Sequence, residues 1–559
     1  MLRSIELFSG ITIGKKEICG RFVIPSGIRC TNASTIDWYF RNIDSIGIIT
    51  TKSISLNPRE GYKEPIYVQY SENSYINAVG LSNPGAKAFA DELAGITVPD
   101  NKFLLVSVFG KDADEFLAAA KILEPYADGF ELNLSCPHAK GYGLQIGHDA
   151  DLAAEIVRVL SDNIEKPLIV KLSASIPNLT DLSKRAVENG ADGFTVTNTI
   201  GPSLEYVDGR PALANVFGGL SGEGIRPLGI RCVREIREAV GSDLTIIGMG
   251  GIYSSEHIRG YANAGADFFG IGSALTNQDS QTAKLFLNSL QDDLQGLGVS
   301  PFKHDAVRNM RYGKCTVIEN QRLTETLHKI TLSRWDGWDQ IQDTAGRFFF
   351  LMIPGVGEKP FAVLSLAERS FIIKNVGYFT NALTNLSAGD EVFIRGPYGK
   401  ALPEFCGRTI YFVAGGTGIS PVYEIACKYS LKNDVRFFLG GQTAGDIFDV
   451  EKFEMLGDVL ISTDDGSRGH KGYVTELLCG FDFSSDKNPV FINCGPKAML
   501  ENCCEIERSI AKLHDIIVSI EYYTSCGVGI CGKCCTETGL LSCVDGPFLC
   551  VEDALKIKA

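Results

Sequence analysis

Short apolar runs alternate with helical stretches between residues 20 and 290. Eight runs stand out: FVIPSG, GIITTKS, FLLVSVFG, GFELNLS, LIVKLS, GFTVTNT, LTIIGMGG and FFGIGSA. Nearly continuous apolar runs are typical of parallel strands buried on both faces, and helical segments such as DLAAEIVRVL and IRCVREIREAV lie between them. This order predicts an α/β fold, a parallel (β/α)8 TIM barrel, which takes roughly 250 residues.

The hydrophobic pattern changes twice after the barrel. Alternating runs such as GRFFFLMI and DEVFIRG predict an antiparallel β-barrel, and TIYFVAGGTGISPVYEIACKY then predicts a nucleotide-binding α/β domain. The last forty residues are rich in cysteine. We therefore expect a barrel over 1–292, a linker over 293–311, a β-barrel over 312–405, an α/β domain over 406–515 and a cysteine-rich segment over 516–559.

Polar and glycine residues gather where the predicted barrel strands end, which is the rim where such barrels place their chemistry. Lys52 and Lys171 each end a strand, and an unpaired buried charge costs several kcal/mol. A flavin ring or an anionic substrate is the expected partner, although a carboxylate at the rim is an alternative. Gly250-Gly251 and Gly272-Ser273 match the usual phosphate site and would fit the phosphate of FMN.

The segment ELNLSCPH places Asn133, Ser135, Cys136 and His138 just past the fourth strand. A buried cysteine is more often a small apolar residue than a catalyst. Because Cys136 lies at the functional rim beside amide and hydroxyl side chains, we interpret it as the candidate acid or base.

The most specific motif is CGVGICGKC, near the C-terminus. It sets Cys526, Cys531 and Cys534 in a C-x4-C-x2-C pattern, and Cys543 follows in the context LSCVDGPFL. This is the spacing of a plant-type [2Fe–2S] cluster, and the intervening glycines let the backbone wrap closely around the sulfurs. A structural zinc site is the alternative, but zinc sites usually use two separated cysteine pairs.

Two glycine turns follow predicted strands of the α/β domain. AGGTGISP, with Gly415, Gly416 and Thr417, follows TIYFV, and CGPKAML follows VFIN. Nucleotides bind at strand ends in open α/β sheets, where backbone amides and a helix N-terminus meet the phosphates. The two turns together predict a dinucleotide site.

Composition narrows the class of protein further. The net charge of −14 is spread along the 559 residues without a polybasic block, which argues against nucleic-acid and membrane partners. We expect a cytoplasmic protein, because no secretory signal or membrane-spanning stretch is recognisable. Its 17 cysteines would then stay reduced and serve in metal binding or catalysis.

With these motifs assembled, residues 20–290 resemble the dihydroorotate dehydrogenases, through IPSG, INAVGLSNPG, ELNLSCP, VKLS, TNT, GGLSG and GMGG. Residues 312–559 resemble the iron–sulfur, FAD-binding electron-transfer subunit of the NAD-linked class (class 1B), through RGPYG, AGGTGISP, TDDGSRGHKG, CGPKAML, CGVGICGKC and CVDGP. That subunit is usually a separate chain. The resemblance therefore implies a fusion of a catalytic subunit with its ferredoxin-reductase-like module.

The resemblance also implies the binding residues. FMN would contact Ser26, Lys52, Ser53, Ser107, Asn133, Lys171, Thr197, Gly222, Gly250, Gly251, Gly272 and Ser273. The substrate would contact Lys52, Asn77, Ala78, Val79, Gly80, Leu81, Asn133, His138, Asn198 and Thr199. Gly377 and Thr380 would help to bind FAD.

By the same resemblance, the enzyme would oxidise (S)-dihydroorotate to orotate in de novo pyrimidine (UMP) biosynthesis. Cys136 would remove the C5 proton while the flavin accepts hydride from C6. Electrons would pass from FMN through the [2Fe–2S] cluster to FAD and then to NAD+. Similar barrels pair as dimers, so a homodimer formed through the barrel is expected.

Alternatives remain open at this point. His138 stands where many dihydroorotate dehydrogenases have asparagine, and SCPH is also typical of dihydropyrimidine dehydrogenases, which reduce uracil or thymine. A non-catalytic redox-sensing protein is a third hypothesis. No residue near GGQTAGDIF distinguishes NAD from NADP.

Overall fold

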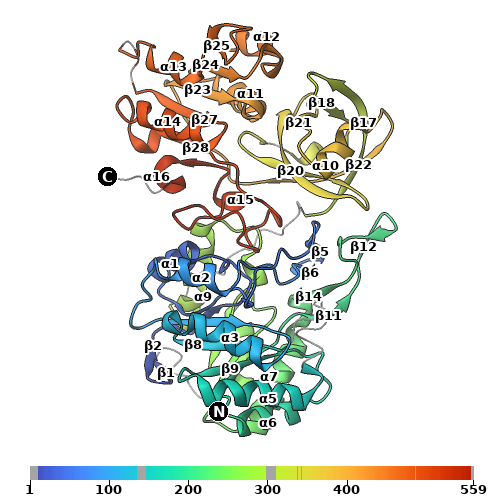
Figure 1. Cartoon of the computed structure of the whole chain (residues 1–559), viewed down its shortest axis with the longest axis vertical. Coiled ribbons are helices and arrows are strands. Elements are labelled where there is room, and N and C mark those ends of the chain that lie inside the picture. The colour runs from blue at the N-terminus through green and yellow to red at the C-terminus, as the bar shows by residue number, and fades with distance from the viewer. Residues whose placement is uncertain are drawn as a thin grey trace. The chain divides into compact units, whose positions relative to one another are not determined.

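The computed structural model describes residues 10–134, 147–297, 310–335, 338–341, 343–484, 486 and 488–555. The chain divides into two compact units (Figure 1). The first comprises Met1–Arg308 together with Val528–Cys535, and the second comprises Asn309–Gly527 together with Thr536–Ala559. Among the described residues, no helix is both long and apolar enough to cross a membrane.

The first unit is built on a closed barrel of parallel strands, which follow one another around the barrel in chain order. The strands are β3 (Phe22–Ile24), β4 (Ile46–Thr50), β7 (Phe103–Val108), β8 (Gly129–Asn133), β9 (Leu168–Leu172), β10 (Gly193–Val196), β15 (Thr245–Met249) and β16 (Phe268–Gly270). Each of the eight predicted runs overlaps one of these strands. The predicted TIM barrel is therefore confirmed.

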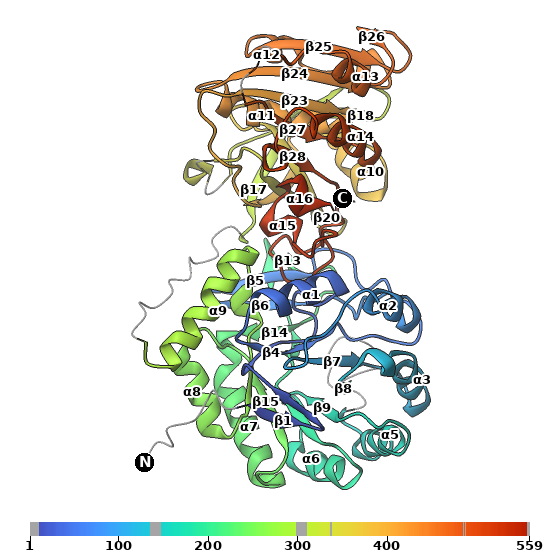
Figure 2. The same cartoon turned by 90° about the vertical axis from the view of Figure 1, so that its left-hand side faces the viewer.

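Helices surround these strands (Figure 2). They are α1 (Ala33–Asn42), α2 (Ala86–Leu93), α3 (Ala113–Leu123), α5 (Ala150–Asn163), α6 (Leu179–Glu188), α7 (Arg226–Val240), α8 (Ser255–Ala264) and α9 (Ser280–Leu294), with short 3₁₀ turns η1 (Glu124–Tyr126), η2 (Glu223–Ile225) and η3 (Ser273–Leu275). Helix α5 buries Ala153, Ile156, Val157 and Leu160, spaced as one helical face. Its first turn is capped by Asp149, which accepts a hydrogen bond from the Leu152 amide.

The interior of this barrel is layered. A lower apolar layer includes Ile48, Phe103, Leu105, Ile169 and Ile247, and the hairpin of β1 (Ile11–Ile13) and β2 (Lys16–Ile18) packs against it. Strand alternation brings further inward-facing residues above this layer, and these are polar. They are Ser107 on β7, Glu131 on β8, Lys171 on β9 and Thr195 on β10, all buried.

A smaller antiparallel sheet was not predicted. It has the strand order β11-β14-β6-β5 and consists of β5 (Tyr67–Ser71), β6 (Ser74–Asn77), β11 (Ile200–Ser203) and β14 (Gly218–Gly222). The separate hairpin of β12 (Tyr206–Val207) and β13 (Arg210–Pro211) follows β11. These strands are short and rich in glycine and polar residues, so they lack the apolar pattern by which strands are recognised.

The second unit begins with a closed antiparallel barrel of order β17-β18-β21-β20-β19-β22, as predicted. Its strands are β17 (Gly313–Arg322), β18 (Leu327–Leu332), β19 (Phe348–Ile353), β20 (Gly357–Ser365), β21 (Ser370–Lys374) and β22 (Glu391–Tyr398), and α10 (Tyr378–Thr384) lies between β21 and β22 along the chain. Val317, Ile330, Phe349, Phe371 and Ile394 contribute to its core.

A seven-stranded sheet of order β26-β25-β24-β23-β27-β28-β29 completes this unit. It comprises β23 (Thr409–Gly415), β24 (Asp434–Gly441), β25 (Asp458–Thr463), β26 (His470–Lys471), β27 (Val490–Cys494), β28 (Ile516–Ser519) and β29 (Phe548–Cys550). Helices α11 (Ile419–Tyr429) and α12 (Val450–Glu454) cover one face, and α13 (Val474–Cys479) and α14 (Lys497–Glu507) cover the other (Figure 2). The short helices α15 (Ser542–Asp545) and α16 (Val551–Ala554) flank β29 along the chain. This sheet confirms the predicted α/β domain, and it also takes in two strands of the predicted cysteine-rich segment.

Candidate active site

A cavity opens at the C-terminal ends of the barrel strands, and most of the residues predicted to bind FMN or substrate line it. Those residues are Ser26, Lys52, Ser53, Asn77, Val79, Gly80, Leu81, Asn133, Lys171, Thr197, Asn198, Thr199, Gly222, Gly250, Gly251, Gly272 and Ser273. Ala78 and Ser107 are buried but do not line the cavity. Cys136 and His138 lie outside the described residues.

Two lysines contribute to the wall of this cavity. The side chain of Lys171 is 4% exposed, and the whole of Lys52 is 8% exposed. The ammonium group of Lys171 lies 3.3 Å from Oε1 of Glu131, a carboxylate that the sequence analysis did not single out. A carboxylate therefore does pair with Lys171, but it lies in the layer beneath the cavity and not at the rim, where the alternative placed it.

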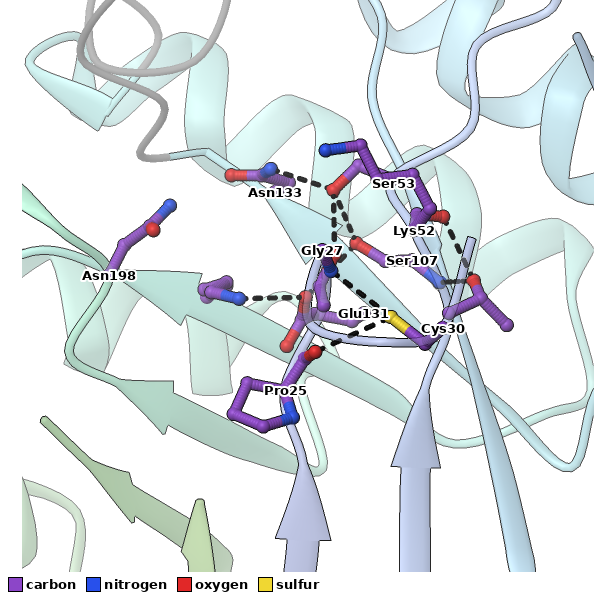
Figure 3. Close-up of polar contacts among 12 residues, drawn as sticks. Pro25, Gly27, Cys30, Lys52, Ser53, Ser107, Glu131, Asn133 and Asn198 are labelled. Carbon is purple, nitrogen blue, oxygen red and sulfur yellow. Dashed lines mark hydrogen bonds and ion pairs between the residues drawn. The ribbon is translucent and has the colours of Figure 1, made fainter. Parts of the chain in front are cut away.

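A chain of hydrogen bonds connects the cavity wall to that layer (Figure 3). Asn133 Nδ2 donates to Ser53 Oγ at 2.9 Å, and Ser53 Oγ lies 2.9 Å from Ser107 Oγ. Ser107 Oγ in turn donates to Glu131 Oε1 at 3.0 Å. Two neighbouring strands, β7 and β8, and the loop after β4 thus hold these residues in one network.

Glycines form a different part of the wall. Gly222, Gly250 and Gly251 have φ angles of 90°, 118° and 69°, in the region that favours glycine. A Cβ atom on Gly251 would lie 2.7 Å from the Gly222 carbonyl oxygen, so a larger residue does not fit. Close-packed glycine backbone of this kind exposes amides to an anion, as a phosphate requires. The residues present therefore fit the phosphate of FMN.

Several cavity residues were missed from the sequence. Tyr67 and Ser221 come from the unpredicted sheet, and Met249 comes from the end of β15. Cys30 does not line the cavity, but its Sγ accepts a hydrogen bond at 3.1 Å from the amide of Gly27, which does (Figure 3). Burial raises the pKa of the Cys30 thiol to about 11, so it stays protonated at neutral pH.

The short segment Val528–Cys535 belongs to the barrel unit. The Arg29 amide donates to the Ile530 carbonyl at 2.9 Å, and Thr31 Oγ1 donates to the Cys531 carbonyl at 2.7 Å. Ile530 lines the cavity. No sequence signal linked this segment to residues 29–31, because they are 500 positions apart in the chain.

The four cysteines of the predicted cluster are all buried. Their exposed fractions are 1% for Cys526, 6% for Cys531, 1% for Cys534 and 1% for Cys543. Gly527, Gly529 and Gly532 have φ angles of 77°, 70° and 72°, so the loop uses the conformational freedom that the motif implied. Within the described ranges, however, no group of three or more His, Cys, Asp or Glu side chains is arranged to hold a metal ion.

The two glycine turns of the α/β domain meet at adjacent strands, β23 and β27. A Cβ atom on Gly495 would lie 3.3 Å from the Gly415 amide nitrogen, and one on Gly418 would lie 2.2 Å from the Cys494 carbonyl oxygen. Gly416 and Thr417 form the 3₁₀ turn η5 (Gly416–Gly418) that leads into α11. This arrangement fits a dinucleotide phosphate site.

Gly377 and Thr380 lie together at the start of α10. Thr380 Oγ1 accepts hydrogen bonds from the amides of Gly377 and Val376, both at 3.0 Å. The hydroxyl therefore caps the helix, and a Cβ atom on Gly377 would have no neighbour within 4 Å.

Comparison with known proteins gives two family matches. The family described as "Dihydroorotate dehydrogenase" matches residues 10–294, and the "Oxidoreductase NAD-binding domain" matches residues 412–505. Several relatives carry the name "Dihydroorotate dehydrogenase B (NAD(+)), catalytic subunit". The Thermoplasma acidophilum protein is 40% identical over 255 residues, 45% of this chain and 82% of the relative.

The relative from Methanocaldococcus jannaschii is 39% identical over 270 residues, which are 47% of this chain and 87% of that protein. The one from Methanothermobacter thermautotrophicus is 36% identical over 262 residues, 46% of this chain and 84% of the relative. A chain of a solved NADH-dependent reduced ferredoxin-NADP oxidoreductase has 25% identity and a TM-score of 0.39, and the match covers 43% of this chain and 89% of that one. That score does not establish a shared fold.

Proposed function

Because the chain belongs to the dihydroorotate dehydrogenase family, we propose that it oxidises dihydroorotate to orotate and passes the electrons to NAD+. It is an oxidoreductase of that family with an NAD-binding domain. The observation that most supports the proposal is the cavity at the barrel rim, lined by both lysines, three asparagines and the close-packed glycines. The reaction would belong to pyrimidine biosynthesis.

FMN would occupy this cavity and supply the hydride acceptor. Gly222, Gly250, Gly251, Gly272 and Ser273 would hold the phosphate, since they form the glycine-rich part of the wall. Ser26, Ser53, Asn133, Thr197 and Lys171 would bind the ring system, with Ser107 supporting Ser53 from below. The buried Lys171 adds a cation to this otherwise neutral group.

The substrate is an anion, so its carboxylate needs a cation and hydrogen-bond donors. Lys52 supplies the charge, and the amides of Asn77, Asn133 and Asn198 all line the same cavity. The segment Asn77–Leu81 would close over the pyrimidine, together with Thr199. Cys136 would take the proton from C5, and His138 would contribute to substrate binding.

The second unit would deliver the electrons to NAD+. The turns at Gly415 and Gly495 would bind the dinucleotide phosphates, and Gly377 and Thr380 would contribute to an FAD site. Cys526, Cys531 and Cys534, in their C-x4-C-x2-C pattern, and Cys543 would ligate a [2Fe–2S] cluster, through which single electrons would pass. Fusion in one chain keeps donor and acceptor at high effective concentration.

The enzyme would act in the cytoplasm, as a homodimer formed through the barrel.

The test uses the full chain, purified without oxygen. Flavin analysis should find FMN and FAD, and the electron paramagnetic resonance spectrum of the reduced protein should report the cluster. Dihydroorotate should drive NADH formation, and Cys136→Ser should lower this rate about 10²- to 10⁴-fold by removing the general base. Cys19→Ser, at an exposed cysteine of the same unit, is the matched control and should leave the rate unchanged.

Three outcomes contradict parts of the proposal. Turnover of dihydrouracil but not dihydroorotate would make the protein a dihydropyrimidine dehydrogenase. Reduction of an artificial dye without NADH formation would refute the electron route through the second unit. Full activity of Cys136→Ser would refute the role of that thiol.

A further inference from the structure

Glu131 is a carboxylate buried inside the barrel, and neither stability nor direct substrate contact accounts for it. Its side chain is 0% exposed, and it does not line the cavity. Oε1 accepts from Ser107 and faces Lys171, whereas Oε2 has no hydrogen-bond partner among the described residues. Removing two charges from water costs several kcal/mol per ion, so an imperfectly satisfied pair is weak evidence for stabilisation.

The position of Glu131 and Lys171 within the barrel explains the buried carboxylate better. Strand register places Ser107 beside Glu131, and Lys171 beside Asn133 on one side and Thr195 on the other. Below lies the apolar layer that contains Phe103, Leu105 and Ile169. Above lies the cavity, which Lys171 reaches and Glu131 does not. The carboxylate therefore does not face the cavity directly, and it contacts the cavity wall through Lys171 and through the hydroxyl chain.

We infer that Glu131 is a positioning residue that holds the Lys171 ammonium at the cavity floor and balances its charge beneath the flavin. This inference rests on the proposed function, because it needs FMN in the cavity. With Glu131 present, the polar layer is neutral overall, since Lys171 and Glu131 are oppositely charged and Ser107 and Thr195 are uncharged. Lys171 would then offer bound flavin a fixed hydrogen-bond donor without a full net positive charge.

Charge balance has a measurable consequence. Reduced flavin carries more negative charge than oxidised flavin, so an unbalanced cation nearby favours reduction. Glu131→Gln keeps the shape and an acceptor for Ser107 and Lys171 but removes the negative charge. The substitution should raise the equilibrium constant for FMN reduction about tenfold, since neighbouring charges interact strongly inside a protein.

The measurement uses the full chain stripped of flavin and reloaded with FMN alone. The flavin is titrated against a redox dye, without dihydroorotate. Thr195→Val is the matched control, because Thr195 is buried in the same layer but uncharged, and it should leave the equilibrium constant unchanged. Lys171→Gln should lower the constant, and the double variant Glu131→Gln/Lys171→Gln should return it close to the wild-type value.

The outcomes separate the inference from the proposed function. Wild-type protein that takes up no FMN would refute the proposed function. Wild-type protein that binds FMN, with a change below about twofold in Glu131→Gln, would overturn the inference alone. If Glu131→Gln does not hold FMN but the double variant does, charge balance is supported. If neither holds FMN while Thr195→Val does, Glu131 serves folding and the inference is wrong.

Discussion

Each unit of the molecule contains a buried ion pair, and the two pairs differ in how completely their atoms are satisfied. In the second unit, Arg395 donates to both carboxylate oxygens of Glu358, at 2.6 and 2.9 Å. Tyr312 donates to the same carboxylate at 2.7 Å, and the Phe350 ring centroid lies 4.1 Å from Arg395 Cζ. In the barrel, Glu131 meets Lys171 through one oxygen at 3.3 Å.

We interpret Arg395–Glu358, the enclosed pair, as structural. We interpret Lys171–Glu131, the open pair beside the cavity, as functional. Arg395 and Glu358 are enclosed on all sides, and Arg395 also donates to the Cys526 carbonyl, so the pair fixes backbone as well as side chains. Lys171 keeps one side towards a cavity, so part of its bonding capacity is left for a ligand. A buried charge that lies beside a cavity and lacks some of its hydrogen bonds is therefore a stronger indication of function than a fully enclosed ion pair.

The largest effect on stability is expected at the enclosed pair. Arg395→Met leaves the Glu358 carboxylate buried without a cation, which should lower the free energy of unfolding of the second unit by about 3–5 kcal/mol. Chemical denaturation followed by tryptophan fluorescence reports it, since two of the three tryptophans, Trp335 and Trp338, lie in that unit. Adding Glu358→Leu should recover most of the loss. A single variant that costs under about 1 kcal/mol would contradict the comparison.

Glu507 extends the comparison of the two ion pairs to a buried carboxyl group whose hydrogen-bond donor is an amide. Glu507 is fully buried on α14, where burial raises its pKa to about 8 although Asn493 donates to it at 2.8 Å. A raised carboxyl pKa means that the folded protein binds the proton more tightly. Its stability contribution is therefore complete below the unfolded pKa near 4.5 and is lost as pH rises towards 8.

Glu507→Gln removes this penalty. The variant should be more stable than wild type by about 2–4 kcal/mol at pH 8 and should gain little at pH 4.5. Thermal unfolding across this pH range measures the difference. An equal gain at both pH values would show that packing, not ionisation, is responsible.

The smallest stability effect is expected at the open pair. Replacing both charges by apolar side chains, Glu131→Leu with Lys171→Met, should change the unfolding free energy of the barrel by under about 1 kcal/mol, because apolar replacement of a buried pair is often neutral. FMN affinity should nevertheless fall at least about tenfold, since a charge-assisted contact is lost. Denaturation and flavin fluorescence titration measure the two effects separately. A large loss of stability would place this pair with the enclosed one.

The local pattern of apolar residues predicted the strands that are apolar along their whole length. The barrel strands are buried on both faces, so runs such as LIVKLS are visible from composition alone. The sheet of β5, β6, β11 and β14 was missed because strands such as Ile200–Ser203, with the sequence IGPS, show no such pattern. Their place in a sheet depends on partners far away in the chain.

The candidate site shows the same division. Lys171 was recognisable because a charge at the end of an apolar strand needs an explanation, whereas Glu131 lay unremarked within ELNLSCP. Its partner is 40 positions away, and only barrel closure makes the two neighbours. Cys30 and Ile530 were likewise invisible, since a buried thiol and an isoleucine carry no signal until their neighbours are known.

The sequence by itself determined the order of the fold types along the chain, the eight strands of the TIM barrel and the residue types that gather at its rim. It did so because burial and glycine turns leave a local record in the choice of residues. Only the tertiary structure decided which carboxylate lies under Lys171, which sheet completes the cavity and which charges are enclosed. Those relations are set by contacts between residues distant in the chain, and a single sequence records no such contact.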